Sequence, residues 1–239
     1  MKIGIIGGNG VAATNKLLTL IEEEMTKKGA FKDCHHPELI VWYATKALSD
    51  NSNSENFIEE YVEIAKKLKD CGADKICISS SSAYSAMDKI SKKADIEIIN
   101  PVDEIAKEAK KYKKAGLITT DYAIDKKVFK NAFDKICPEV EIIYPDDEFQ
   151  KMIAKGINNI KDYHRFEPTE SQTRPNNIFK KIQEHLKSKG AETIITGSID
   201  IRVDYFERTN IDFAEVLKNL ILKEALKSVI KYKDNNNER

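Results

Sequence analysis

The chain has 239 residues, enough for two small α/β lobes with a sizeable core. Hydrophobic residues make up 41% and charged residues 33%, which excludes a collagen-like or disordered chain. Lysine plus arginine equals aspartate plus glutamate at 39 each, so the net charge gives no reason to expect nucleic acid or an anionic membrane as a partner.

The apolar run at the N-terminus is too short and too interrupted by glycine to be a signal peptide. No later apolar stretch reaches membrane-spanning length. The cysteines, at positions 34, 71, 77 and 137, have neither CxxC spacing nor the density of a disulfide framework. We therefore expect reduced thiols in a cytoplasmic protein.

Strand-like and helix-like segments alternate from one end of the chain to the other. The expected strands are residues 2–6, 39–43, 75–79, 116–119, 141–144 and 193–196. The expected helices carry apolar residues at helical spacing: residues 17–25, 57–68, the serine turn through 90, 102–109, 128–133, 149–160, 178–186 and about 213–230.

This repeated strand–helix order predicts an α/β protein with a mainly parallel sheet in each half and helices on both faces. Ligands of such sheets bind beyond the carboxyl ends of the strands, where the strand-to-helix loops gather. The loops expected to form a ligand site are therefore residues 7–10, 79–82, 119–123 and 197–200.

Read in chain order, these loops resemble the Asp/Glu racemase family. KIGIIGGNGVAAT (residues 2–14) is similar to the family's glycine turn, GGMGPxAT. GADKICISSSSAYSAMDKI (residues 72–90) resembles the first catalytic segment, GADxIVIPCNTAHxxxDxI, and GAETIITGSIDI (residues 190–201) resembles the second, GAEGVILGCTEI. GLITTDYAI, EIIYPDD and NIDFAEVLKNLILKEAL follow the family pattern in order and spacing.

The resemblance implies two pseudo-symmetric α/β/α lobes that face each other across a cleft, in a homodimer. The first lobe would comprise residues 1–100 plus about 205–239, and the second about 101–204. It also implies a reaction without pyridoxal phosphate, metal or other cofactor. One cysteine thiolate removes the α-proton of an amino acid and the opposite thiol returns a proton, because a thiol pKa of about 8.5 suits both roles.

The chain departs from the family at both catalytic positions, since the first cysteine falls on Ser80 and the second on Ser198. Serine keeps the hydrogen bonding of cysteine, but its hydroxyl is a far weaker acid and needs an adjacent base. The two-thiol mechanism therefore cannot operate. Several neighbouring positions also differ, which favours natural drift over an engineered double substitution.

Other positions carried over from the family are expected to contact a small carboxylate or amino acid. They are Gly8, Asn9, Gly10, Ser81, Ser82, Tyr84, Thr120, Lys161, Ile199 and Asp200. Among them, serines replace the usual Asn-Thr pair, a tyrosine replaces a histidine, and an aspartate replaces a glutamate. The family's substrate-carboxylate arginine falls near Asn51, and a shifted alignment offers Lys46 instead.

Simpler interpretations stand beside these. A serine of residues 79–82 can cap the following helix, and Tyr84 can be a packing aromatic. The glycine turn does not fit GxGxxG, so a dinucleotide site is not expected. Cys34, His35 and His36 lack further ligands at metal-site spacing.

Three functions remain open from the sequence. The first is a family protein that binds a small carboxylate or amino acid without two-thiol racemisation. The second is an active isomerase or related carbon-acid enzyme in which Ser80 and Ser198 act with Asp200, Tyr84 or Lys161. The third is a non-catalytic structural or interaction protein.

Overall fold

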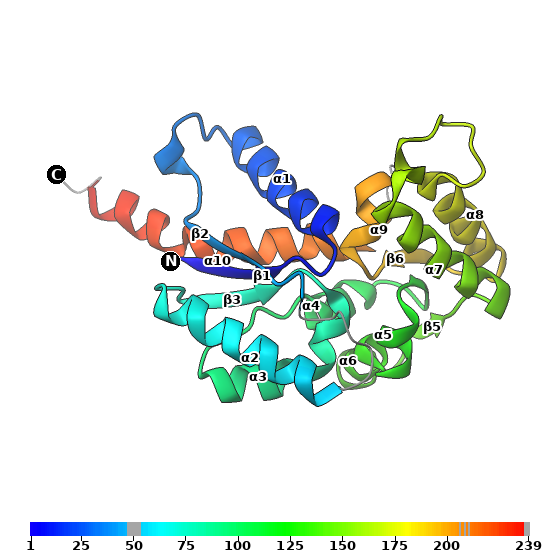
Figure 1. Cartoon of the computed structure of the whole chain (residues 1–239), viewed down its shortest axis with the longest axis horizontal. Helices are drawn as coiled ribbons and strands as arrows, with labels where there is room; N and C mark the ends of the chain where they lie inside the picture. The colour runs from blue at the N-terminus through cyan, green and yellow to red at the C-terminus, as the bar shows by residue number, and fades with distance from the viewer. Residues whose placement is uncertain (47–53, 206, 208, 210, 237–239) are drawn as a thin grey trace. The chain divides into compact units, whose positions relative to one another are not determined.

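The computed structural model describes residues 1–46, 54–205, 207, 209 and 211–236 (Figure 1). The strands are β1 (Ile3–Gly7), β2 (Leu39–Tyr43), β3 (Lys75–Ile78), β4 (Lys114–Ile118), β5 (Glu141–Ile143), β6 (Thr193–Thr196) and β7 (Ile211–Asp212). The α-helices are α1 (Val11–Lys27), α2 (Ser54–Asp70), α3 (Met87–Ala94), α4 (Pro101–Ala109), α5 (Asp121–Asp125), α6 (Val128–Ile136), α7 (Asp147–Lys161), α8 (Pro175–Ser188), α9 (Ile199–Asp204) and α10 (Phe213–Asn236). Short 3₁₀ turns are η1 (Asp33–His35), η2 (Ser81–Ala86) and η3 (Tyr163–Phe166).

The chain forms two compact units. Unit 1 consists of Met1–Ser79, Ala86–Ile99 and Leu217–Arg239, and unit 2 consists of Ser80–Ser85 and Asn100–Val216. Compactness does not measure independent folding, so the lobe boundaries expected from the sequence stay a prediction.

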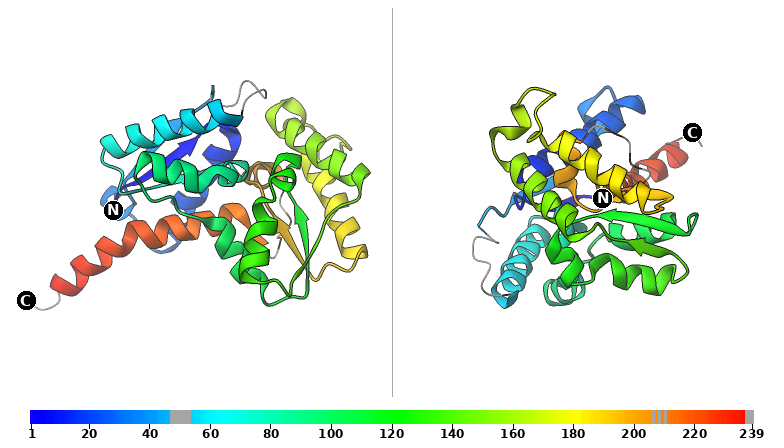
Figure 2. Two further views of the ribbon diagram at one scale, coloured as in Figure 1. Left: turned by 90° about the horizontal axis from the view of Figure 1, so that it is seen from below. Right: turned by 90° about the vertical axis from the view of Figure 1, so that its right-hand side faces the viewer.

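Unit 1 is built on a three-stranded parallel sheet in the order β2-β1-β3. All five residues of β1 are buried, as a central parallel strand requires. α2 and α3 pack against each other on one side of the sheet, and α10 runs along the other (Figure 2). α10 is tied to α1 by an ion pair of 3.2 Å between Lys218 and Glu24.

Unit 2 is built on a four-stranded parallel sheet in the order β5-β4-β6-β7. α8 packs on β4 and β6 and carries α7 beside it, while α4 contacts α6 and β7. α4 begins where it does because the side chain of Asn100 accepts hydrogen bonds from the first-turn amides and Pro101 occupies the first turn.

The two parallel sheets confirm the predicted α/β class. Each of the six expected strands is present, and β7 was missed because a two-residue strand leaves no periodicity to read. The helix expected from the serine turn was wrong in type over its first part, since η2 is 3₁₀ and α3 begins only at Met87. α10 extends past residue 230 to Asn236. Within the described part of the chain, none of the helices is both long and apolar enough to span a bilayer.

Candidate functional site

The glycine turn after β1 is held by one buried threonine of unit 1. Gly8 and Gly10 have φ values of 87° and 89°, which favour glycine. The hydroxyl of Thr14 accepts a hydrogen bond from the Gly8 amide at 2.9 Å and lies 3.1 Å from the hydroxyl of Ser79. A Cβ at Gly8 would lie 2.6 Å from the backbone nitrogen of Ala44, so this turn also abuts the end of β2.

Asn9, between the two glycines, is already engaged within unit 1. Its side chain hydrogen-bonds the hydroxyl of Tyr61, a fully buried residue of α2 whose pKa is raised by burial. At the start of α1 the capping residue is Gly10, and no side chain of the described residues caps the first-turn amides. The amides at this turn are suited to an anionic group.

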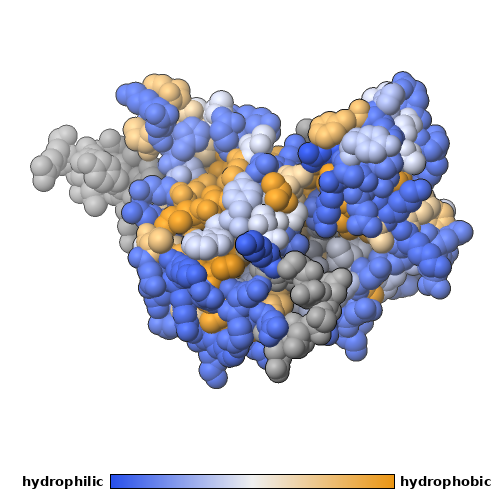
Figure 3. All heavy atoms as spheres, in the orientation of Figure 1, coloured by the Kyte–Doolittle hydropathy of each residue, from blue (hydrophilic) through white to orange (hydrophobic). Residues whose placement is uncertain are grey.

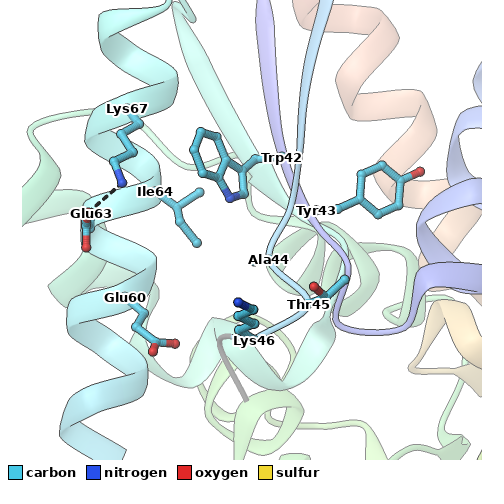
Figure 4. Close-up of a pocket in the computed structure, with 9 residues that line it drawn as sticks. All are labelled: Trp42, Tyr43, Ala44, Thr45, Lys46, Glu60, Glu63, Ile64 and Lys67. Carbon is cyan, nitrogen blue, oxygen red and sulfur yellow. Dashed lines mark hydrogen bonds and ion pairs between the residues drawn. The ribbon is translucent and has the colours of Figure 1, made fainter. Parts of the chain in front are cut away.

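A pocket of about 290 Å³ opens beyond the carboxyl end of β2, between β2 and α2 (Figure 4). Lys46 and Glu60 lie at one end of it, and Trp42, Ile64 and Lys67 line the other. The Lys67 ammonium is 5.4 Å from the centre of the Trp42 ring and 2.6 Å from the Glu63 carboxylate. Lys46, the alternative to the family arginine, therefore borders a cavity, whereas Asn51 lies outside the described residues.

The serine segment that resembles the first catalytic motif belongs to unit 2. Ser81 is buried, while Ser80 and Ser82 are half-buried. The hydroxyl of Ser82 lies 3.0 Å from that of Thr120, which accepts a hydrogen bond from the Ala123 amide and so caps α5. Tyr84 is buried and meets the ring of Phe213 edge-on at 5.8 Å, the geometry of a packing aromatic.

The Thr120 loop is joined to the end of β6 through Thr119. The Thr119 hydroxyl donates to the Gly197 carbonyl at 3.4 Å, and the Gly197 amide donates to the Ile118 carbonyl at 2.8 Å. The loops after β4 and β6 are therefore neighbours, as expected for adjacent parallel strands.

Gln150, which the sequence analysis did not single out, holds the same loop from α7. Its amide nitrogen donates to the Thr119 carbonyl at 3.1 Å and to the Asp121 carboxylate at 2.6 Å. Its Oε1 is buried without a hydrogen-bond partner among the described residues. The only sequence signal was its place in the first turn of the helix that follows EIIYPDD.

The second serine position, Ser198, caps α9 in unit 2. Its Oγ accepts from the Asp200 amide at 3.3 Å and lies 3.4 Å from Asp200 Oδ2. Ile199, between them, has a buried side chain, so only its backbone can reach a ligand.

Asp200 is the most perturbed group of this loop. Burial raises the pKa of its carboxyl group above the ordinary value, although the charge of Lys161 and the Ser198 hydrogen bond act in the opposite direction. Its Oδ1 is buried and has no hydrogen-bond partner within the described part of the chain. A buried acceptor left unpaired is costly and is suited to a ligand that donates a hydrogen bond.

None of the four cysteines lies in these loops. Cys77 is buried in β3, where burial raises its pKa, and Cys137 is buried after α6 with its pKa raised for the same reason. Cys34 and Cys71 are exposed in unit 1, at η1 and just after α2. No three His, Cys, Asp or Glu side chains gather as metal ligands in the residues that the structure describes.

Two parallel sheets, with serine- and threonine-rich loops beyond the ends of β3, β4 and β6, define an α/β protein of the two-sheet racemase type. A sequence profile of the Asp/Glu/Hydantoin racemase family matches residues 3–203. The chain belongs to this family.

Solved structures share the fold at low identity. Aspartate racemase of Picrophilus torridus is 19% identical over 94% of both chains, with a TM-score of 0.76. An aspartate racemase homologue from Pyrococcus horikoshii is 20% identical over 95% of this chain and 99% of the other, with a TM-score of 0.72. Glutamate racemase of Francisella tularensis, in complex with D-glutamate, is 14% identical over 95% and 81%, with a TM-score of 0.65.

Proposed function

We propose that this protein binds a small amino acid or carboxylate through the loops after β3, β4 and β6, and that it does not racemise its ligand by the two-thiol route. The observation that carries the proposal is serine at both cysteine positions, Ser80 and Ser198, with every cysteine of the chain elsewhere. Members of the same fold act on aspartate and glutamate, and one was solved with D-glutamate bound.

Polar groups of opposite character support an amino acid as the ligand. The unpaired Oδ1 of Asp200 would accept a hydrogen bond from the ammonium group. The Ser80 hydroxyl, and whichever hydroxyl of the Ser82–Thr120 pair accepts the hydrogen bond within that pair, would donate to the carboxylate. The charge of Lys161, which already acts on Asp200, would attract the same carboxylate.

Expectations that came with the family resemblance form part of the proposal. The protein acts as a cytoplasmic homodimer without a cofactor, and the glycine turn at residues 8–10 offers backbone amides to an anionic group. Lys46, which borders the pocket beyond β2, is the residue that a shifted alignment offers in place of the family arginine.

A second candidate is a carbon-acid enzyme that uses a carboxyl group as its acid and base. The observation that favours it is the raised pKa of Asp200, which lies 3.4 Å from the Ser198 hydroxyl. A carboxyl group with a raised pKa holds a proton more readily, so it can both take and return one. In this mechanism Asp200, rather than Ser198, would exchange the α-proton of the amino acid.

The test is proton NMR of L-aspartate and L-glutamate in D₂O with the purified protein, followed over hours. We expect saturation transfer from the protein to the ligand, which reports binding, and no loss of the α-proton signal. The Ser80→Cys/Ser198→Cys variant is expected to gain exchange, because it restores the acid/base pair at the same positions.

Matched variants separate the two candidates. Lys161→Met should weaken saturation transfer, while Lys155→Met, at an exposed position on the same helix, should leave it unchanged. Loss of the α-proton with the native protein would overturn the first candidate. If Asp200→Asn then abolished that exchange, the second would stand. Absence of saturation transfer with either amino acid would contradict amino-acid binding.

A further inference from the structure

β2 is an apolar edge strand of the unit 1 sheet in the described part of the chain. Its sequence is LIVWY, and none of its five side chains is fully buried. Trp42 and Tyr43 are each 39% exposed. In the space-filling view, hydrophobic residues gather over β2, between α1 and α2 (Figure 3).

The backbone of β2 is available along the same edge. β2 pairs with β1 on one side, and no described strand pairs with its other side. The Glu38 carbonyl and the Ala44 amide both bond to β1, at 3.1 and 2.9 Å. Because backbone groups alternate in direction along a strand, the amides and carbonyls of Leu39, Val41 and Tyr43 face the open edge.

This edge lacks the features that keep exposed strands apart. Edge strands of soluble proteins are usually interrupted by charged residues, proline or a bulge, and β2 contains none of these. A continuous apolar strand with unpaired backbone groups is a template for another strand, so a specific partner on it is the arrangement compatible with a soluble protein.

Resting on the homodimer proposed above, we infer that its interface is β2 paired with β2 of the second copy, antiparallel, about a two-fold axis at Val41. This pairing places Val41 opposite Val41 and Leu39 opposite Tyr43. Two backbone hydrogen bonds join each of these pairs, because the amides and carbonyls of these residues face the open edge. On the opposite face, Ile40 lies against Trp42. Each unlike pair joins an aliphatic with an aromatic side chain, a favourable cross-strand combination.

The charges that flank the strand fit the same antiparallel partner. Glu38 precedes β2, and Lys46 follows it by three residues. In an antiparallel pair the end of one strand that carries Glu38 lies beside the end of the other that carries Lys46, so opposite charges approach each other at both ends. A parallel partner would instead place glutamate beside glutamate and lysine beside lysine. The strand is therefore complementary to itself in one direction only.

The first test is the sedimentation of the full chain in the ultracentrifuge. The native protein is expected to be a dimer, and Val41→Lys is expected to weaken its self-association by about a hundredfold or more, because two ammonium groups then face each other at the axis. Val41→Thr keeps β-branching without charge and should remain dimeric. Phe31→Lys, at a residue that is 81% exposed elsewhere on unit 1, should also remain dimeric. Circular dichroism checks that each variant is folded.

The second test reads the register. In a Cys34→Ser/Cys71→Ser background, which removes the exposed native thiols, Val41→Cys should form a disulfide-linked dimer under mild oxidation. Paired residues at the axis lie about 5.5 Å apart between Cα atoms, within disulfide range. Ile40→Cys, which faces Trp42 of the partner subunit, should not cross-link.

Three outcomes would overturn the inference. They are a native protein that stays monomeric, a dimer that Val41→Lys leaves intact, and cross-linking that is no stronger at position 41 than at position 40. A monomer whose β2 binds a different protein falls under the first of these.

Discussion

Asp200 carries a carboxyl group whose buried surroundings disfavour its ionised form. Burial raises its pKa, and the opposing effects of Lys161 and Ser198 are smaller. Its folded pKa lies above its value in the unfolded chain, so the stability that this group contributes is fully present below the unfolded pKa and is lost as the pH rises through the folded pKa. Above its folded pKa the ionised carboxylate is therefore a cost to folding, which a ligand ammonium would offset.

We predict that Asp200→Asn raises the thermal midpoint of the protein without ligand at pH 7, and that the gain disappears as the pH falls toward 4. Asp204→Asn is the matched control, because this carboxylate is 4% exposed and bonds to the Arg174 guanidinium at 3.0 Å. It should lower the free energy of unfolding by about 1–3 kcal/mol. Scanning calorimetry across this pH range measures both, and a loss of stability at pH 7 in Asp200→Asn would contradict the prediction.

Between elements, α7 and α8 approach each other closely at a glycine. A Cβ on Gly156 of α7 would lie 2.8 Å from the Phe179 ring of α8, in a fully buried contact. Glycine is unfavourable inside a helix, so its presence here reflects the space that the aromatic ring needs. This contact fixes the helix whose ends carry Gln150 and Lys161 beside the candidate site.

Gly156→Ala should therefore destabilise the protein although alanine is the better helix former. Overpacking costs about 1–3 kcal/mol, against a gain of about 1 kcal/mol in helix propensity. Gly156→Ala/Phe179→Leu makes room for the added methyl group and should recover part of the loss. Urea unfolding measures both variants. A more stable single variant would show that α7 and α8 can separate without cost.

In the whole molecule, the two units are connected where the chain crosses from one to the other, and they share one helix. The chain passes between them at residues 79–80, 85–86, 99–100 and 216–217. α10 buries Phe213 in unit 2 and Leu217 and Ile221 in unit 1. Loss of either core would remove packing from this common helix, so the units should unfold together.

We predict coincident urea transitions for far-UV circular dichroism, which reports both units, and for the fluorescence of Trp42, the one tryptophan of the chain, which reports unit 1. The Trp42→Phe/Phe149→Trp variant moves the reporter to unit 2 and should give the same midpoint. Separate midpoints for the two reporters would instead indicate independently folding lobes.

Predictions from sequence were best where a short pattern carries the physics. β2 and β6 were predicted at their observed bounds because apolar runs closed by loop residues are typical of parallel strands. α5 and α9, of five and six residues, were missed because one turn of helix has no periodicity. Capping by Thr120 and Ser198, rather than an apolar stripe, defines where they begin.

The sequence by itself determined the α/β class, the family and the presence of serine at residues 80 and 198, because motif order and residue identity are properties of the chain. Only the tertiary structure decided that Asp200 has a buried oxygen without a partner among the described residues, that Gln150 holds the Thr119 loop, and that β2 is an edge strand of the described sheet. Burial, hydrogen-bond pairing and strand order arise when distant segments pack together, and no local pattern encodes them.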